Sequence, residues 1–134
     1  MREILFRGKR TDSGEWVEGY LSKSRDENKQ LKLCIDHEEQ GVMCSSIVYP
    51  ETIGQYTGLT DKNGKKIFEG DIISIPFEED VVYYENAEVY FDTEHYGWYV
   101  RYFDDDSFRL LVYNDGDITV IGNIHDNPRT AERR

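Results

Sequence analysis

The chain has 134 residues and a formal net charge of −11, and 38% of its residues are hydrophobic, 13% aromatic and 32% charged. This length suits one domain or two small fused lobes, and the composition is that of a folded protein rather than a disordered one. No stretch approaches the roughly 18 to 20 apolar residues that span a bilayer, and the start, MREILFRGKR, lacks the apolar core of a secretion signal, so we expect a cytoplasmic protein without a membrane segment.

The negative charge is concentrated in the second half of the chain. Residues 1–70 contain 11 Lys and Arg against 12 Asp and Glu (net −1), whereas residues 71–128 contain 2 against 14 (net −12). Residues 129–134 contain 3 against 1 (net +2). Such an acidic segment repels phosphate backbones and attracts basic surfaces. We therefore expect a protein partner, with a basic one favoured, and no direct nucleic-acid binding by the second half.

Alternation of apolar and polar residues predicts short strands along the first half. These strands are expected at residues 4–7, 16–21, 31–36 and 42–49. Turn residues at 11–14 join the first two into a β-hairpin, and the polar residues 22–30 predict a solvated loop. An acidic loop is expected at 37–41, and Pro50 ends the last strand because it has no N–H to donate.

The second half predicts further strands separated by Gly and Asn turns. Asn63 and Gly64 predict a hairpin turn, in which both central residues need positive φ. Apolar residues on a shared face are expected in three strands: Ile73 with Ile75, then Ala87, Val89 and Phe91, then Trp98, Val100 and Tyr102. A final hairpin is expected to join 110–113 to 118–121. Short strands at this spacing predict a small closed or nearly closed barrel, and Asn127 with Pro128 gives a helix-start signal.

Three segments together resemble a known family. They are residues 53–73, residues 120–128, and the start of the chain at 6–10 with 16–19. They resemble the YopX family of small proteins that bacteriophages and prophages encode. The resemblance implies a mostly β (β-rich α+β) fold. Its expected parts are an N-terminal β-hairpin lobe at 1–58, an SH3-type small β-barrel at 59–128 and a short tail at 129–134. It implies no established activity, cofactor or catalytic residue.

The first of these segments has a physical explanation that does not depend on the family. Gly70 permits a tight approach or a positive φ, and Asp71 can hydrogen-bond nearby backbone, so the two residues suit the sharp start of a strand. We therefore expect the shared residues to serve mainly the fold.

Cys34, His37 and Cys44 are the candidate metal ligands, and Glu38 or His95 would complete a tetrahedral zinc shell. Their spacing fits no standard zinc pattern, and both cysteines lie in apolar runs where a free thiol behaves as a small hydrophobe. We expect neither a metal nor another cofactor, and zinc stays open as the alternative.

Catalytic motifs are missing from the sequence. Residues 58–66 differ from a phosphate-binding loop in glycine spacing, and no nucleophile elbow or HExxH occurs. His125 beside Asp126 is a weak general-base candidate because neighbours on a strand point to opposite faces. We expect a non-enzymatic protein, with a metal-dependent or hydrolytic enzyme as the alternative.

The sequence thus predicts a phage or prophage accessory protein. We expect it to act in the bacterial host cell by protein–protein contact through its acidic, aromatic half, and assembly with itself is one form of this hypothesis. The expected contact residues are Asp104, Asp105, Asp106, Asp115, Asp117, Tyr99 and Phe103. A second alternative is a DNA mimic that binds a basic nucleic-acid-binding protein. A third is nucleic-acid binding by the N-terminal lobe through the cluster Arg2, Arg7, Lys9 and Arg10.

Overall fold

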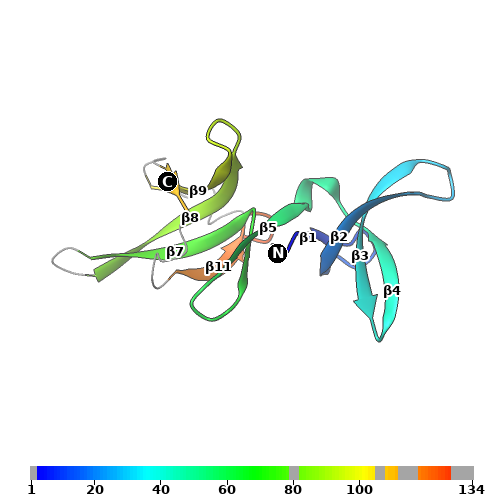
Figure 1. Cartoon of the computed structure of the whole chain (residues 1–134), viewed down its shortest axis with the longest axis horizontal. Helices are drawn as coiled ribbons and strands as arrows, with labels where there is room; N and C mark the ends of the chain where they lie inside the picture. Colours follow the sequence, from blue (N-terminus) through cyan, green and yellow to red (C-terminus); the bar gives the residue numbers. More distant parts are fainter. Residues whose placement is uncertain (1–2, 79–81, 105–107, 112–117, 128–134) are drawn as a thin grey trace. The chain divides into compact units, whose positions relative to one another are not determined.

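The structure, a computed structural model, describes residues 3–78, 82–104, 108–111 and 118–127. The described residues form β-strands and one 3₁₀ turn, η1 (Pro50–Thr52), without an α-helix, which confirms the mostly β prediction. In these ranges no helix is long and apolar enough to cross a membrane. The chain divides into two compact units, Met1–Tyr56 and Thr57–Arg134 (Figure 1), close to the boundary expected after residue 58.

Two sheets contain all the strands of the described residues. The first has the order β4-β3-β2-β1-β5-β6 and the second the order β10-β9-β8-β7-β11. The strands are β1 (Phe6–Lys9), β2 (Trp16–Arg25), β3 (Leu31–Glu39), β4 (Val42–Ile47), β5 (Gly54–Thr60), β6 (Lys66–Phe68), β7 (Asp71–Glu78), β8 (Val82–Asp92), β9 (Gly97–Tyr102), β10 (Phe108–Leu110) and β11 (Thr119–Asn123). Strand β5 begins in the first unit and ends in the second.

Two strands of the first unit are longer than predicted. Strand β2 continues into the loop expected at 22–30 as far as Arg25, and β3 continues into the loop expected at 37–41 as far as Glu39. The Asp26 carboxylate closes the shorter β2–β3 turn by accepting the N–H groups of Asn28 and Gln30, each at 2.9 Å. Gln40 and Gly41, both with positive φ, form a two-residue turn that lets β3 and β4 pair up to their ends.

The hydrophobic core of the second unit lies on one face of its sheet. Of the residues predicted to share an apolar face, Ile73, Ile75, Ala87, Val89, Val100 and Tyr102 are buried there, together with Ile67, Leu111 and Ile118. Trp98 is partly buried against them, whereas Phe91 is 39% exposed. Figure 1 shows β7 and β8, which supply four of these buried residues, as a long paired ribbon. Strands β5 and β6 are neighbours, as predicted, but of the two turn residues only Gly64 has positive φ.

Most of the hairpin expected between residues 110 and 121, including its turn, lies outside the described residues. Strand β10 pairs with β9 and strand β11 pairs with β7, so the two strands lie at opposite ends of the sheet order. Neither sheet closes within the described residues, and the predicted SH3-type barrel is therefore not confirmed.

Candidate binding surface

Strands β8, β9 and β10 present a set of side chains on the face of the second sheet opposite its core. Their register places Tyr90 opposite Tyr99, and Phe108 opposite Arg101. Side chains alternate along a strand, so these residues point away from inward neighbours such as Val100, which is fully buried. We name this set the aromatic face: Glu88, Tyr90, His95, Tyr99, Arg101, Phe108 and Leu110.

The rings of the aromatic face form a connected cluster. The centroid of the Tyr99 ring lies 6.3 Å from that of Tyr90, 5.5 Å from that of His95 and 6.1 Å from that of Phe108. The centroids of the His95 and Phe108 rings lie 6.4 Å apart. These separations are typical of interacting aromatic side chains. Phe108 is 54% exposed and Leu110 49% exposed. The cluster therefore offers apolar area to solvent on a rigid sheet.

Arg101 is held within the aromatic face. Its guanidinium carbon lies 4.4 Å from the centroid of the Tyr90 ring, and one of its nitrogens lies 3.9 Å from a Glu88 carboxylate oxygen. Burial raises the pKa of Glu88, and the charge of Arg101 acts in the opposite direction. Burial is also the main cause that raises the pKa of Tyr90. Arg101 thus serves as an internal cation of this surface.

The β8–β9 turn closes one end of the aromatic face through Asp92. One carboxylate oxygen of Asp92 accepts the N–H groups of Glu94 (2.8 Å) and His95 (3.2 Å), and the other lies 3.2 Å from His95 Nδ1. Burial by itself would raise the pKa of Asp92, but these interactions outweigh it and lower the pKa. A cleft of about 560 Å³ lies against this turn and is lined by Tyr90, Phe91, Asp92, Thr93, Glu94, His95, Arg101 and Phe108.

The structure places three of the predicted contact residues. Tyr99 lies on the aromatic face, and Asp104 is exposed next to the end of β9. Phe103 is only 3% exposed, so its ring is inside the second unit and not on its surface. The other predicted residues, Asp105, Asp106, Asp115 and Asp117, lie outside the described residues. The neighbours of Tyr99 on this face, His95, Tyr90 and Phe108, were not predicted from the sequence. For Tyr90, the alternation of residues along β8 and β9 already indicated the shared face.

The three candidate zinc ligands are not brought together. Cys34 and His37 are an odd number of positions apart on β3, so their side chains lie on opposite faces of the strand. Cys44 lies opposite His37 in the register, whereas Cys34 lies opposite Ile47. Both cysteines are free thiols, and burial is the main cause that raises the pKa of Cys34. Among the described residues no group of three or more His, Cys, Asp or Glu side chains is placed to hold a metal ion.

His37 instead forms a polar pair inside the first unit. Its Nε2 lies 2.7 Å from the Ser46 hydroxyl oxygen, and its Nδ1 lies 3.8 Å from a Glu39 carboxylate oxygen. The order Ser46, His37, Glu39 resembles a hydrolytic triad. However, Ser46 and His37 are each 9% exposed, and Glu39 is bound by Arg10 at 3.2 Å. The arrangement is that of two buried polar groups that satisfy each other.

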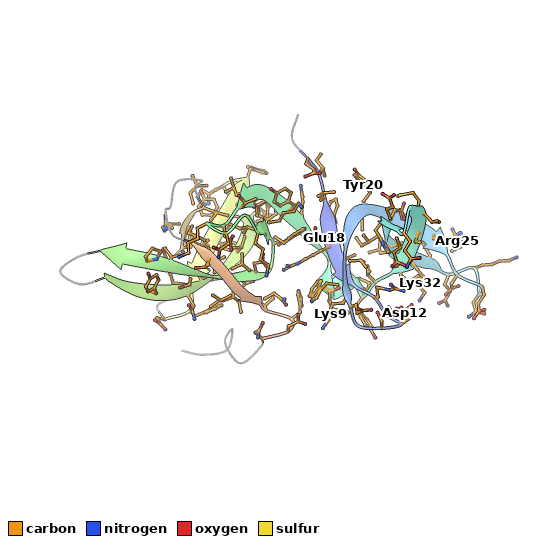
Figure 2. The ribbon with its side chains drawn as sticks, turned by 90° about the horizontal axis from the view of Figure 1, so that it is seen from below. Lys9, Asp12, Glu18, Tyr20, Arg25 and Lys32 are labelled. Atoms are coloured by element: carbon orange, nitrogen blue, oxygen red, sulfur yellow. The ribbon has the colours of Figure 1, made fainter. Side chains whose placement is uncertain are left out.

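The cationic cluster at the start of the chain is engaged internally. The guanidinium of Arg7 and the ammonium of Lys9 lie 4.8 Å and 5.7 Å from the centroid of the Trp16 ring. Arg10 forms ion pairs with Asp12 and Glu39. Figure 2 labels Lys9 and Asp12 on this part of the first unit. Arg2 lies outside the described residues. Arg7, Lys9 and Arg10 are thus each in contact with a side chain of the first unit.

The first family-like segment is built from two carboxylates that accept backbone N–H groups. Asp71, 1% exposed, accepts the N–H of Phe68 at 2.7 Å across Gly70, whose φ is +90°. Asp61, 7% exposed, accepts the N–H groups of two residues in its own turn and that of Val120, at 2.9 to 3.0 Å. The expectation that such residues serve the fold agrees with these contacts.

The second family-like segment is a turn held by two asparagines. The Asn123 side-chain oxygen accepts the N–H groups of His125 and Asp126, at 3.0 and 2.9 Å. The Asn127 side-chain oxygen accepts the N–H of Asn123 at 3.1 Å. A Cβ on Gly122 would overlap that same Asn127 oxygen. The backbone roles of His125 and Asp126 are thus those of turn residues.

The two antiparallel sheets, the carboxylate-closed corner and the asparagine turn together define a small, mostly β protein of two compact units. The chain belongs to the YopX protein family, which it matches over residues 5–132. Among solved structures it is similar to protein EF1440 from Enterococcus faecalis, with a TM-score of 0.54 and 26% identity over 98% of this chain and 100% of that chain. None of the curated proteins compared with the chain matches it.

Proposed function

We propose that this chain is a non-enzymatic accessory protein of a phage or prophage, and that it binds a basic protein segment through the aromatic face. The observation that carries the proposal is the connected, partly exposed ring cluster of Tyr99, His95 and Phe108 on one sheet face. Aromatic side chains supply large contact area at low entropic cost and are enriched in protein interfaces.

Charge supports a basic partner. Residues 71–128 contain 14 Asp and Glu against 2 Lys and Arg. Both cations are engaged within the unit, since Arg101 lies over Tyr90 and Arg109 donates to the Tyr102 hydroxyl at 2.6 Å. Asp92 and Glu94 line the cleft beside the rings. A Lys or Arg side chain that enters this cleft meets carboxylates and aromatic rings, and both attract cations.

The test uses three short peptides of equal length, one basic, one neutral and one acidic, each with one aromatic residue and a fluorescent label. We expect fluorescence anisotropy to show binding of the basic peptide, weakened by added salt. The double substitution Tyr99→Ala with Phe108→Ala should abolish this binding. Tyr49→Ala, which removes a 44% exposed ring from the first unit, is the matched control and should leave binding intact.

Equal affinity for the basic and acidic peptides would refute the proposal, as would unchanged binding by the double variant. The DNA-mimic alternative predicts one more result in the same assay. A basic nucleic-acid-binding protein used as the probe must then be displaced from the chain by duplex DNA. Binding that resists both DNA and salt would rule out mimicry and leave an apolar contact as the basis of recognition.

A further inference from the structure

Strand β4 ends the first sheet with an edge that has no charged residue, proline or bulge to hinder pairing with another strand. Natural sheets protect their edges with charged residues, proline, bulges or very short strands. Of the four terminal strands of the two sheets, β6 contains Lys66, β10 contains Arg109, and β11 has a register shift between Val120 and Gly122. Strand β4, with the sequence VMCSSI, has no charge, no proline and a regular register.

The register shows which backbone groups of β4 face away from the sheet. Val48 donates its N–H to the Leu33 carbonyl of β3, and hydrogen-bonding direction alternates along an antiparallel strand. The even-numbered residues of β4 therefore bond to β3, and the backbone groups of Met43, Ser45 and Ile47 point outward. The Ile47 carbonyl agrees with this, because it accepts the N–H of Thr11 at 3.0 Å from the outer side.

Thr11 thus covers one end of the β4 edge, and within the described part of the chain no strand pairs with the outward groups of Met43 and Ser45. The side chains beside them are apolar and exposed. Val42 and Met43 are each 63% exposed, and Cys44 is partly exposed. A paired strand would cover this apolar area and satisfy the outward N–H and C=O groups together.

We propose that β4 pairs with β4 of a second copy of this chain, antiparallel and about a two-fold axis through Cys44. A two-fold axis makes the same patch meet itself, which suits an uncharged edge because no like charges are brought together. In this register Met43 of each copy exchanges hydrogen bonds with Ser45 of the other. This register uses both remaining outward residues and does not need Ile47, whose carbonyl already accepts the N–H of Thr11.

The register fixes the position of the thiol. Cys44 then faces Cys44 of the second copy as a non-hydrogen-bonded pair, in which Cα atoms are about 4.5 Å apart. That separation lies within the range of a disulfide, about 4.4 to 6.8 Å. Cys34, which is 1% exposed, has no such access. Mild oxidation should therefore trap the dimer through Cys44.

The first test is the mass of the full chain by light scattering over a range of concentrations. Ser45→Pro removes the outward N–H and leaves the bonds to β3, because proline is tolerated where its missing N–H faces away from the sheet. We expect it to weaken dimerisation by at least about tenfold, since symmetry removes the donor twice. Ser45→Ala is the matched control. It loses the same hydroxyl bond to Asp36 but keeps the N–H, and should stay dimeric.

A second pair of variants distinguishes loss of the interface from a folding defect caused by Ser45→Pro. Met43→Lys introduces a charge at the edge and should give a monomer with an unchanged circular dichroism spectrum. Tyr20→Lys introduces the same charge at a 59% exposed site on β2, labelled in Figure 2, and should stay dimeric because β2 is already paired on both sides.

Oxidation gives an independent measurement. A copper–phenanthroline catalyst should cross-link the wild type and Cys34→Ser, but not Cys44→Ser. A monomer at every concentration would overturn the proposal, and so would a dimer that survives both Met43→Lys and Ser45→Pro. A dimer that Met43→Lys disrupts but that Cys44 does not cross-link would overturn the register through Cys44.

Discussion

Asp61 should be one of the residues on which the stability of the second unit depends most. Its Oδ1 accepts the N–H groups of Asn63 and Lys65, each at 2.9 Å, and its Oδ2 accepts that of Val120 at 3.0 Å. The residue thereby ties the β5–β6 turn to β11, which is 59 positions away in the sequence. Asp61→Ala removes all three acceptor contacts and leaves three backbone donors to find water.

The expected loss follows from the number of contacts. A hydrogen bond of this kind contributes on the order of 1 kcal/mol, so Asp61→Ala should lower the free energy of unfolding by about 3 kcal/mol. For a unit of this size that corresponds to a fall in Tm on the order of 15 °C. Asp61→Asn keeps one acceptor oxygen, which can serve the two donors in the turn but not Val120. We expect it to cost about half as much.

The pH dependence of stability gives a second, independent test of the role of Asp61. Burial opposes ionisation of Asp61, but the backbone donors of Val120, Lys65 and Asn63 outweigh it and hold its pKa below the usual 3.8. A carboxyl with a lowered folded-state pKa stabilises the fold above its unfolded pKa, and this contribution is lost as the pH falls through the folded-state value. The difference between wild type and Asp61→Asn should therefore be full near neutral pH and shrink below a pH of about 3.8.

The assay is urea unfolding followed by tryptophan fluorescence. The chain has one Trp in each unit, Trp16 and Trp98. In a Trp16→Phe background, Trp98 reports on the second unit alone. Asp12→Asn, which removes an exposed carboxylate in the first unit, is the control and should leave the Trp98 transition unchanged. A loss below about 1 kcal/mol for Asp61→Ala, or an Asp61→Asn difference that grows in acid, would refute the argument.

Three further predictions concern other parts of the chain. Gly19→Ala should lower the free energy of unfolding of the first unit by more than about 2 kcal/mol, because the added Cβ would overlap the Asp36 carbonyl of β3. Gly14→Ala meets no neighbouring atom, but the positive φ of this residue should make it cost about 1 kcal/mol. Trp16 fluorescence in a Trp98→Phe background measures both changes. Cys44 should react with a thiol reagent much faster than Cys34, whose buried thiol has a raised pKa, and equal rates would contradict the burial. Ser46 should remain unlabelled by a fluorophosphonate, since it is 9% exposed; labelling that His37→Ala abolishes would instead establish hydrolytic chemistry.

Local sequence patterns determined much of the secondary structure. Alternation identified the inward residues of β7, β8 and β9, because one face of each strand must be apolar to be buried. Asn63-Gly64 and Pro50 marked the right turn and the right strand end. The family could also be recognised from the sequence. Residues such as Asp61 and Asn123 close turns through their own side chains, and the spacing of such residues is a pattern that the sequence alone shows.

Strand length in the first unit was not determined by such patterns. Residues 22–25 and 37–39 are polar and were expected to be loops, yet they pair as strands. Residues 22–25 pair with the start of β3 and residues 37–39 form its end, and most of these side chains are exposed. Backbone hydrogen bonds, not apolar alternation, therefore hold both ends of the strand in the sheet. The turns at Asp26–Gln30 and Gln40–Gly41 set those lengths, through side-chain acceptors and positive φ.

The mostly β character of the chain, the concentration of negative charge in residues 71–128 and several of the turns could be predicted without coordinates, because they depend on composition and on contacts between near neighbours. The pairing of β10 and β11 with different strands required the folded structure. So did the burial of Phe103, the grouping of Tyr99 with His95 and Phe108 on one face, and the placement of Cys34 and His37 on opposite faces. Each of these depends on the register between strands distant in sequence, and a shift of one residue in register would reverse the face on which every side chain lies.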